Sequence, residues 1–160
     1  MGKESFEHKL IKGKIAETIF VLMFRDTNKF TVLHFGYEFT VPTLAQHRDT
    51  VVMKKVLSQV EKSPDFILVT ENKEQVYFVE VKYRANPNKK DIYEIAQGIT
   101  KRWEICHLFL VTNDGFYFSP ISKVISKKGE VSKLSTNWVS RDIQNKYLEL
   151  SADFLAQHKD

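Results

Sequence analysis

An apolar stripe at helical spacing is the first pattern along the chain, over residues 4–25. Apolar side chains recur there every three or four positions, which predicts an amphipathic helix. Its second half is apolar nearly all round, so we expect it to be buried on more than one side. The polar letters DTNK at 26–29 should end it. The members of the stripe are Leu10, Ile11, Ile15, Ile19, Leu22 and Met23.

A strand, a helix and a β-hairpin are predicted next. Residues 30–41 are rich in β-branched and aromatic side chains and predict a strand that ends at Pro42. A helical stripe follows through about residue 60. Residues 63–84, SPDFILVTENKEQVYFVEVKYR, place two apolar runs around the polar letters ENKE, as in a hairpin. The stripe of the helix consists of Leu44, Val51, Val52, Val56 and Val60.

The rest of the chain predicts four further elements. Asp91 can cap a helix whose apolar face ends at Trp103. The letters CHLFLVT at 106–112 are typical of a strand buried on both faces, and an Asn-Asp-Gly turn leads into FYFSP. Residues 124–134 resemble a hairpin around Lys128 and Gly129. A last helix over 140–157 should have an inner stripe of Ile143, Tyr147, Leu150 and Phe154.

Together these elements predict an α/β (α+β) fold with a central mixed sheet and helices on both faces. The length of 160 residues suits one domain, residues 1–160, with one core. The single cysteine, Cys106, excludes a disulfide framework and a cysteine-rich zinc site. The longest early apolar run is too short to span a bilayer, and the first ten residues lack the order of a signal peptide. We therefore expect a cytoplasmic protein without a membrane partner, or alternatively one that is exported by a route that leaves no N-terminal mark.

The net charge is +4, a mild excess that permits an anionic partner without demanding one. The distribution is more informative, because residues 82–102 contain six basic side chains and only two acids, Asp91 and Glu94. A solvated face is the alternative reading of this segment. The basic residues are Lys82, Arg84, Lys89, Lys90, Lys101 and Arg102.

Charged residues interrupt the hairpin in a specific geometry. Side chains alternate across a strand, so Glu80 and Lys82 project from one face. If ENKE is a four-residue connection, Thr70 pairs with Gln75 and Asp65 lies opposite Glu80. Opposed residues have Cβ atoms about 5 Å apart. At an effective dielectric constant of about 20, two carboxylates at that separation repel by about 3 kcal/mol.

A divalent cation shared by the two carboxylates would relieve this repulsion. Lys82 would then stand beside the metal, where an ammonium group can orient water or stabilise negative charge on a phosphate. The alternative is a surface hairpin with a Glu–Lys ion pair beside a frayed Asp65. The geometry alone leaves both interpretations open.

Pro64-Asp65 followed by Glu80-Val81-Lys82 on the next strand resembles the motif of the PD-(D/E)XK nuclease superfamily. The resemblance spans about residues 12–112. It implies a restriction-endonuclease-like core of αβββαβ order, here within residues 4–118 and with one extra helix before the hairpin. Residues 119–160 would form a C-terminal hairpin and helix of unknown role.

The resemblance implies hydrolysis of DNA, less often RNA, that depends on Mg²⁺ or Mn²⁺. Asp65 and Glu80 would be the central ligands, with the Val81 carbonyl as a third and Glu17 as an accessory ligand. Lys82 would position the nucleophile and stabilise charge. The alternative is that Glu17 lies on an exposed strip or pairs with Lys14, one turn back along its helix.

Further residues of the site follow from the same resemblance. Gln97 matches a glutamine that some members carry on the helix after the lysine. Arg84 extends the face of Lys82 and could hold a neighbouring phosphate. Trp103 and Trp138 could stack on bases, although Trp103 ends an apolar stripe and is expected in the core. The remaining nucleic-acid-binding candidates are Lys89, Lys90, Lys101 and Arg102.

The sequence therefore predicts a DNA endonuclease of repair, recombination or restriction type that recognises DNA structure or backbone. Small relatives such as Holliday-junction resolvases commonly act as dimers, so a homodimer is predicted by analogy. The alternative is a catalytically silent module of the same fold that binds nucleic acid or a protein partner.

Overall fold

The structure is a computed structural model that describes residues 5–35 and 63–156. Nine helices and strands fall within these ranges. The second half of the strand predicted over 30–41 and the helix predicted up to residue 60 lie outside them. None of the described helices is long and apolar enough to cross a membrane.

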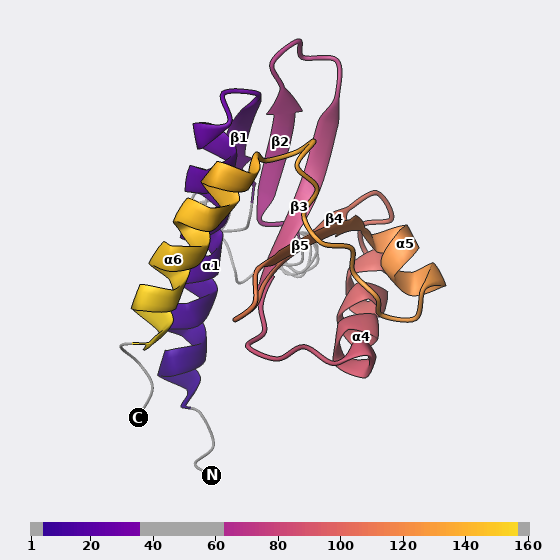
Figure 1. The fold of residues 1–160 in the computed structure, drawn as a ribbon. Coiled ribbons are helices and arrows are strands. Elements are labelled where there is room, and N and C mark those ends of the chain that lie inside the picture. The colour runs from indigo at the N-terminus through magenta and orange to yellow at the C-terminus, as the bar shows by residue number, and fades with distance from the viewer. Residues whose placement is uncertain (1–4, 36–62, 157–160) are drawn as a thin grey trace, which may run out of the picture.

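A mixed five-stranded sheet forms the centre of the fold (Figure 1), in the order β1-β2-β3-β4-β5. Neighbouring strands are antiparallel except for β3 and β4, which run parallel and are joined through a helix. The strands are β1 (Phe30–His34), β2 (Phe66–Thr70), β3 (Val76–Tyr83), β4 (His107–Val111) and β5 (Phe116–Pro120).

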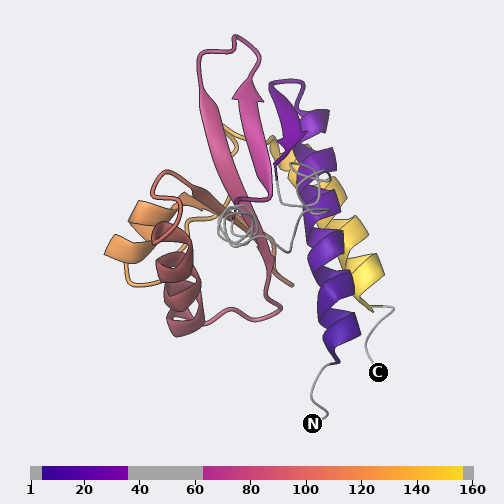
Figure 2. The ribbon, with the colours of Figure 1, turned by 180° about the vertical axis from the view of Figure 1, so that it is seen from behind.

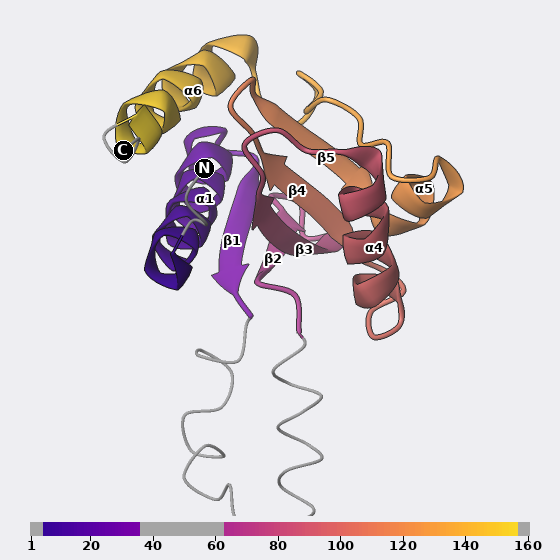
Figure 3. The same cartoon turned by 90° about the horizontal axis from the view of Figure 1, so that it is seen from below.

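Helices cover both faces of the sheet, as predicted (Figure 3). α1 (Phe6–Asp26) and α6 (Arg141–Ala156) lie on one face, and α4 (Lys89–Thr100) and α5 (Ile121–Ser126) lie on the other. Seen from behind, the same two pairs of helices flank the sheet (Figure 2). The molecule is therefore an α+β protein with a mixed sheet between two helical layers.

Alternation along β4 supplies both layers of the core. Phe109 and Val111 pack towards α1, whereas Leu108 and Leu110 pack towards α4 and α5. This confirms the prediction of a strand that is buried on both faces. The layer under α1 is rich in aromatic rings, and Phe20 contacts Phe109 with ring centroids 5.0 Å apart.

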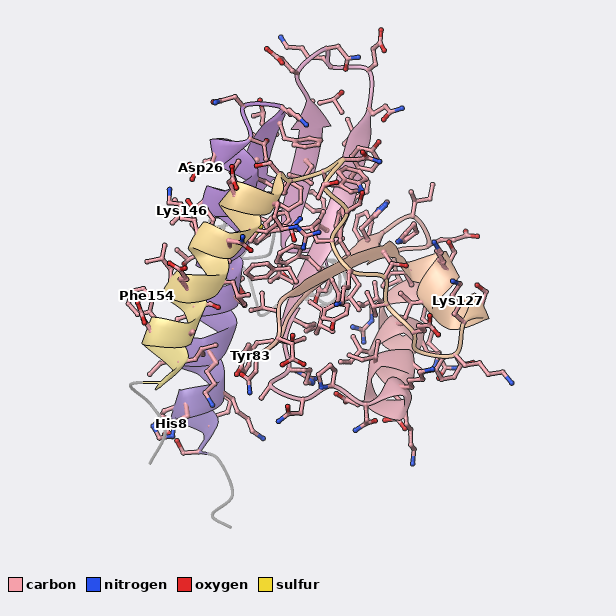
Figure 4. The ribbon with its side chains drawn as sticks, in the orientation of Figure 1. His8, Asp26, Tyr83, Lys127, Lys146 and Phe154 are labelled. Carbon is pink, nitrogen blue, oxygen red and sulfur yellow. The ribbon has the colours of Figure 1, made fainter. Side chains whose placement is uncertain are left out.

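α1 and α6 run antiparallel side by side and are joined at one end by Asp26 (Figure 4). Its carboxylate accepts hydrogen bonds from Lys146 Nζ at 3.0 Å and from the Tyr147 hydroxyl at 2.6 Å. These contacts fix the last turn of α1 against α6.

The inner stripe predicted for the last helix is wrong at two of its four positions. Leu150 is 40% exposed and Phe154 is 53% exposed, whereas Tyr147, Ser151 and Leu155 are buried. The stripe that faces the core is thus rotated round the helix from the predicted one. Leu150 and Phe154 instead line an apolar groove of about 470 Å³ between α1 and α6.

The hairpin predicted over 124–134 is also wrong, because α5 occupies its first part. Ile121 and Val124 are both buried towards α4, at helical spacing. Lys128 (φ 52°) and Gly129 (φ 93°) end the helix, with the Gly129 N–H bonded to the Val124 carbonyl at 2.9 Å. This is a Schellman C-cap, whose positive φ values resemble the sequence signal of a tight hairpin turn.

The N-cap of α4 is Asn88 and not the predicted Asp91. The Asn88 side chain accepts the Asp91 N–H at 2.8 Å. Asp91 therefore lies in the first turn of the helix, where a carboxylate also interacts favourably with the helix dipole.

Candidate active site

The register of the β2–β3 hairpin is the predicted one. Phe66 pairs with Val79, and Val69 pairs with Val76. The Thr70 N–H bonds to the Gln75 carbonyl at 3.0 Å, which closes the four-residue connection. Continued by one residue, this register sets Asp65 opposite Glu80, as the sequence predicted.

Asp65 joins three strands at the point where β2 begins. Its main-chain carbonyl accepts the Phe35 N–H at 3.0 Å, next to the end of β1. Its side-chain Oδ2 accepts the Val81 N–H of β3 at 2.8 Å. Asp65 directly precedes the first residue of β2, and its carboxylate there accepts the hydrogen bond of a main-chain donor of β3. This bond fixes the position of the Asp65 side chain where β2 begins.

Glu80 and Lys82 lie on the same face of β3, as predicted. Lys82 Nζ is 2.6 Å from Glu80 Oε1, and their side chains are 35% and 15% exposed. Opposite them on β4 stand Leu108 and Leu110, which belong to the core. The ion pair is therefore held against an apolar wall, with Lys82 the more accessible partner.

The Asp65 carboxyl group has an unusually high pKa. Burial raises its pKa to about 7, and the negative charge of Glu80 acts in the same direction. The Val81 N–H and the positive charge of Lys82 offset part of this shift. Repulsion between the two opposed acids is thus present, but burial is the larger cause.

Glu17 has features of both predicted roles, the accessory metal ligand and the partner of a lysine on its own helix. Its carboxylate pairs with Lys14 at 3.0 Å, one turn back along α1. It also lines the same cleft as Asp65, and its charge contributes to the raised pKa of that residue. Glu17 therefore lies near Asp65 without touching it in this arrangement.

The cleft beside Asp65 has a volume of about 530 Å³ and lies between α1 and the end of β3. Basic side chains of both elements line it, together with the two carboxylates Asp65 and Glu17. The sequence analysis did not predict the two lysines of α1, although both lie on the same helix as Glu17. The basic residues are Lys9, Lys12, Lys82 and Arg84.

Oxygen donors of the kind that Mg²⁺ binds are present, but they have protein partners. Across residues 5–35 and 63–156, no three His, Cys, Asp or Glu side chains are grouped closely enough to hold a metal. Mg²⁺ is usually held by one or two carboxylates together with water and substrate phosphate. Asp65 and Glu80 fit that smaller set, because a cation would offset the charge that raises the pKa of Asp65.

The other predicted site residues lie before, along and just after α4. Arg84 lines the cleft, where its Nε pairs with Asp91 at 2.7 Å and its Nη1 donates to the Tyr83 carbonyl at 2.8 Å. Lys89 pairs with Glu130 at 3.5 Å, away from the cleft. The remaining candidates are exposed on or just after α4 and do not line the cleft: Gln97, Lys90, Lys101 and Arg102.

Both tryptophans are partly buried and pack against the core. Trp103 packs on Phe78 with ring centroids 5.3 Å apart, which confirms its predicted place. Trp138 packs on Tyr77 at 5.1 Å and on Phe118 at 5.0 Å, and its stacking on bases stays a prediction. Cys106 is also a core residue, and burial raises its pKa to about 12.

No protein-family model matches the chain, and no curated protein matches its sequence. A functional interpretation therefore depends on the chemistry of the site itself.

Proposed function

We propose that this protein is a metal-dependent endonuclease that hydrolyses phosphodiester bonds in DNA. The observation that carries the proposal is the hairpin register, which sets Asp65 opposite Glu80 and places Lys82 on the same face of β3. A basic cleft opens beside these residues. Paired carboxylates, an ammonium group and a basic surface are the groups that phosphodiester hydrolysis requires.

The two opposed carboxylates would hold Mg²⁺ or Mn²⁺. Glu17 and the Val81 carbonyl are the further donors near them. When bound, the metal would polarise a phosphoryl oxygen and lower the pKa of a water molecule. The carboxyl of Asp65 must be ionised for this role, and its raised pKa predicts weaker metal binding as the pH falls below about 7.

Lys82 acts as a cation in this proposal and not as a general base. Burial acts to lower its pKa, but the charge of Glu80 and the hydrogen bond to it outweigh burial, and the pKa is raised. The ammonium group therefore stays protonated at neutral pH. A protonated Lys82 can donate hydrogen bonds to a water molecule or to a phosphate oxygen on which negative charge develops.

The element order supports a restriction-endonuclease-like core. Among the described elements, α1, β1, β2, β3, α4 and β4 follow one another in the order αβββαβ. We extend the proposal to an enzyme of repair, recombination or restriction type, which works as a homodimer and recognises DNA structure or backbone. Cleavage of RNA is the less common activity of such enzymes and belongs in the same test.

Two ion pairs favour a second candidate, a catalytically silent module of the same fold. Lys82 is held by Glu80 at 2.6 Å, and Glu17 is held by Lys14 at 3.0 Å. In such a module these lysines would take the place of the metal and neutralise the acids. The two candidates differ in whether the site requires a divalent cation.

The test is to incubate the purified protein with plasmid, single-stranded, branched and RNA substrates in Mg²⁺, Mn²⁺ or EDTA. Asp65→Ala and Lys82→Ala proteins are assayed beside it. We expect cutting by the wild type in Mg²⁺ or Mn²⁺ and none in EDTA, with both variants inactive. Nucleic-acid binding without cutting, unaffected by EDTA, would instead identify the silent module.

A further inference from the structure

The cleft beside Asp65 is lined by more than the acids and Lys82. Lys9 and Lys12 face it from the first half of α1, and Tyr83 and Arg84 face it from the end of β3. Four basic side chains and one aromatic ring, that of Tyr83, thus line one opening. Surfaces of this composition bind single-stranded nucleic acid, because cations hold the phosphates and rings stack on the bases.

The charge of the lining favours an anion. Four basic side chains line the cleft against the two carboxylates Asp65 and Glu17. Lys82 and Arg84 also pair with Glu80 at 2.6 Å and with Asp91 at 2.7 Å, so the two lysines of α1 contribute most to the positive charge of the lining. A polyanion is attracted to such an opening, and this attraction weakens as salt rises.

Tyr83 offers a ring that is held in place from two sides. Its hydroxyl donates to Asn113 Oδ1 at 3.1 Å, which anchors the tip of the side chain. Lys12 Nζ lies 5.7 Å from the centroid of the same ring. Figure 4 shows Tyr83 between α1 and the chain that leads from β3 to α4. Because Lys12 Nζ lies over this ring, a base stacks on it when the ammonium group moves from the ring to the neighbouring phosphate.

The size of the cleft suits a single nucleotide. Its volume of about 530 Å³ falls within the range of about 300–1,000 Å³ that is typical of pockets for single small molecules. A nucleotide is a molecule of that size. In a duplex the bases are stacked and paired, so that no base face is available to Tyr83.

We propose that the cleft between α1 and the end of β3 binds single-stranded DNA, with Lys9 and Lys12 on the phosphates and Tyr83 stacked on a base. This inference deepens the proposed function, on which it rests for the identity of the polyanion. It places the substrate preference of the site in unpaired DNA, such as an overhang, a flap or the open centre of a branched molecule.

The test measures binding of a fluorescent single strand of about 12 nucleotides, and of its duplex, in EDTA so that no cutting occurs. The Lys9→Ala/Lys12→Ala protein is compared with Lys123→Ala/Lys127→Ala, which removes the same charge from exposed positions at α5. In Figure 4, Lys127 lies far from α1. We expect the single strand to bind more tightly than the duplex, and the cleft variant to bind it at least 10-fold more weakly than the α5 variant.

Salt dependence distinguishes phosphate contacts from a general loss of structure. For single strands the slope of log K against log salt is about −0.7 per phosphate contact, so loss of two contacts should make it shallower by about 1.4. The α5 variant should keep the wild-type slope. Equal binding by the two variants, or a duplex bound as tightly as the single strand, would overturn the inference.

Two substitutions of Tyr83 test the stacking role. Tyr83→Phe keeps the ring and removes the bond to Asn113, and should bind the strand nearly as the wild type does. Tyr83→Ala removes the ring and should bind about 5- to 100-fold more weakly. Circular dichroism and the thermal midpoint of both proteins show whether they are folded. A folded Tyr83→Ala protein with wild-type affinity would contradict the role of the ring.

The inference and the proposed function can fail separately. A protein that binds the strand through Lys9 and Lys12, yet never cuts it in Mg²⁺ or Mn²⁺, supports the cleft and contradicts the nuclease. A protein that cuts DNA through Asp65, but binds it independently of Lys9 and Lys12, supports the nuclease and contradicts the cleft.

Discussion

The Asp65 carboxyl group experiences opposing influences in the folded protein. Burial and the charge of Glu80 favour its neutral form, whereas the Val81 N–H and the charge of Lys82 favour its ionised form. The first pair prevails, and the pKa rises from 3.8 to about 7. An ionised Asp65 is consequently destabilising in the metal-free protein, which is expected where a site is built for ligand binding rather than for stability.

This shift predicts how stability depends on pH. Between pH 4 and 7 the folded state binds more protons at Asp65 than the unfolded state does, so the free energy of unfolding falls as the pH rises through that interval. Asp65→Asn is neutral at every pH and can still accept the Val81 N–H. In EDTA we expect it to match the wild type near pH 4 and to be more stable by about 1–3 kcal/mol at pH 8.

Urea denaturation at the two pH values measures the effect, with Asp153→Asn on the exposed side of α6 as the control. His107 titrates in the opposite sense, because burial lowers its pKa to about 4, but it is present in all three proteins and cancels in the comparison. An Asp65→Asn protein that is less stable than the wild type at pH 8 would show that the ionised Asp65 carboxylate does not destabilise the folded protein.

Among the elements, α5 and its C-cap determine how α5 packs against α4. Gly129 ends α5 with φ at 93° and lies against the first residue of α4. A Cβ atom built on Gly129 would be 1.9 Å from the Lys89 carbonyl oxygen. This contact requires glycine both for its conformation and for the close approach of two backbones.

Gly129→Ala should therefore destabilise the protein by about 2–4 kcal/mol, since it adds a clash to an unfavourable φ. Gly98→Ala is the matched control, because Gly98 lies inside α4 with nothing within 4 Å of its Cβ position. That change should stabilise the helix by about 0.5–1 kcal/mol. Urea midpoints of the two variants that shifted in the same direction would contradict this account.

The sequence predicted the β2–β3 hairpin well because two constraints agree there. Alternation fixes which side chains share a face, and the four-residue connection fixes which residues are opposed. The prediction failed at α5, where Lys128 and Gly129 carry a signal common to a hairpin turn and a helix C-cap. Only the packing of Ile121 and Val124 towards α4 distinguishes the two.

For the candidate site, the sequence identified Asp65, Glu80 and Lys82 but not Lys9 and Lys12. The first three follow from strand geometry within one hairpin. The two lysines reach the cleft because of how α1 lies across the end of β3, a long-range packing that local periodicity does not determine. The basic residues on and just after α4 do not line the cleft, and their contacts with nucleic acid stay a prediction.

At the scale of the whole molecule, the helical layers on the two faces of the sheet both build the core and both contribute residues to the proposed site. α1 covers the aromatic layer of the core and also supplies Lys9, Lys12 and Glu17 to the cleft. α4 packs on the opposite face and supplies Asp91, which holds Arg84 at the edge of the cleft. The proposed site therefore lies where elements from both layers meet the end of β3.

The central claim is that Asp65 and its neighbours form a catalytic site, and the rate of DNA cleavage by Asp65→Asn tests it most directly. This variant is expected to be at least as stable as the wild type at pH 8, so a loss of activity cannot be attributed to unfolding. With Mg²⁺ or Mn²⁺ on the best substrate, we predict cleavage by the wild type and by Asp153→Asn, and a loss of at least about 100-fold in Asp65→Asn. Undiminished cleavage by Asp65→Asn would contradict the account.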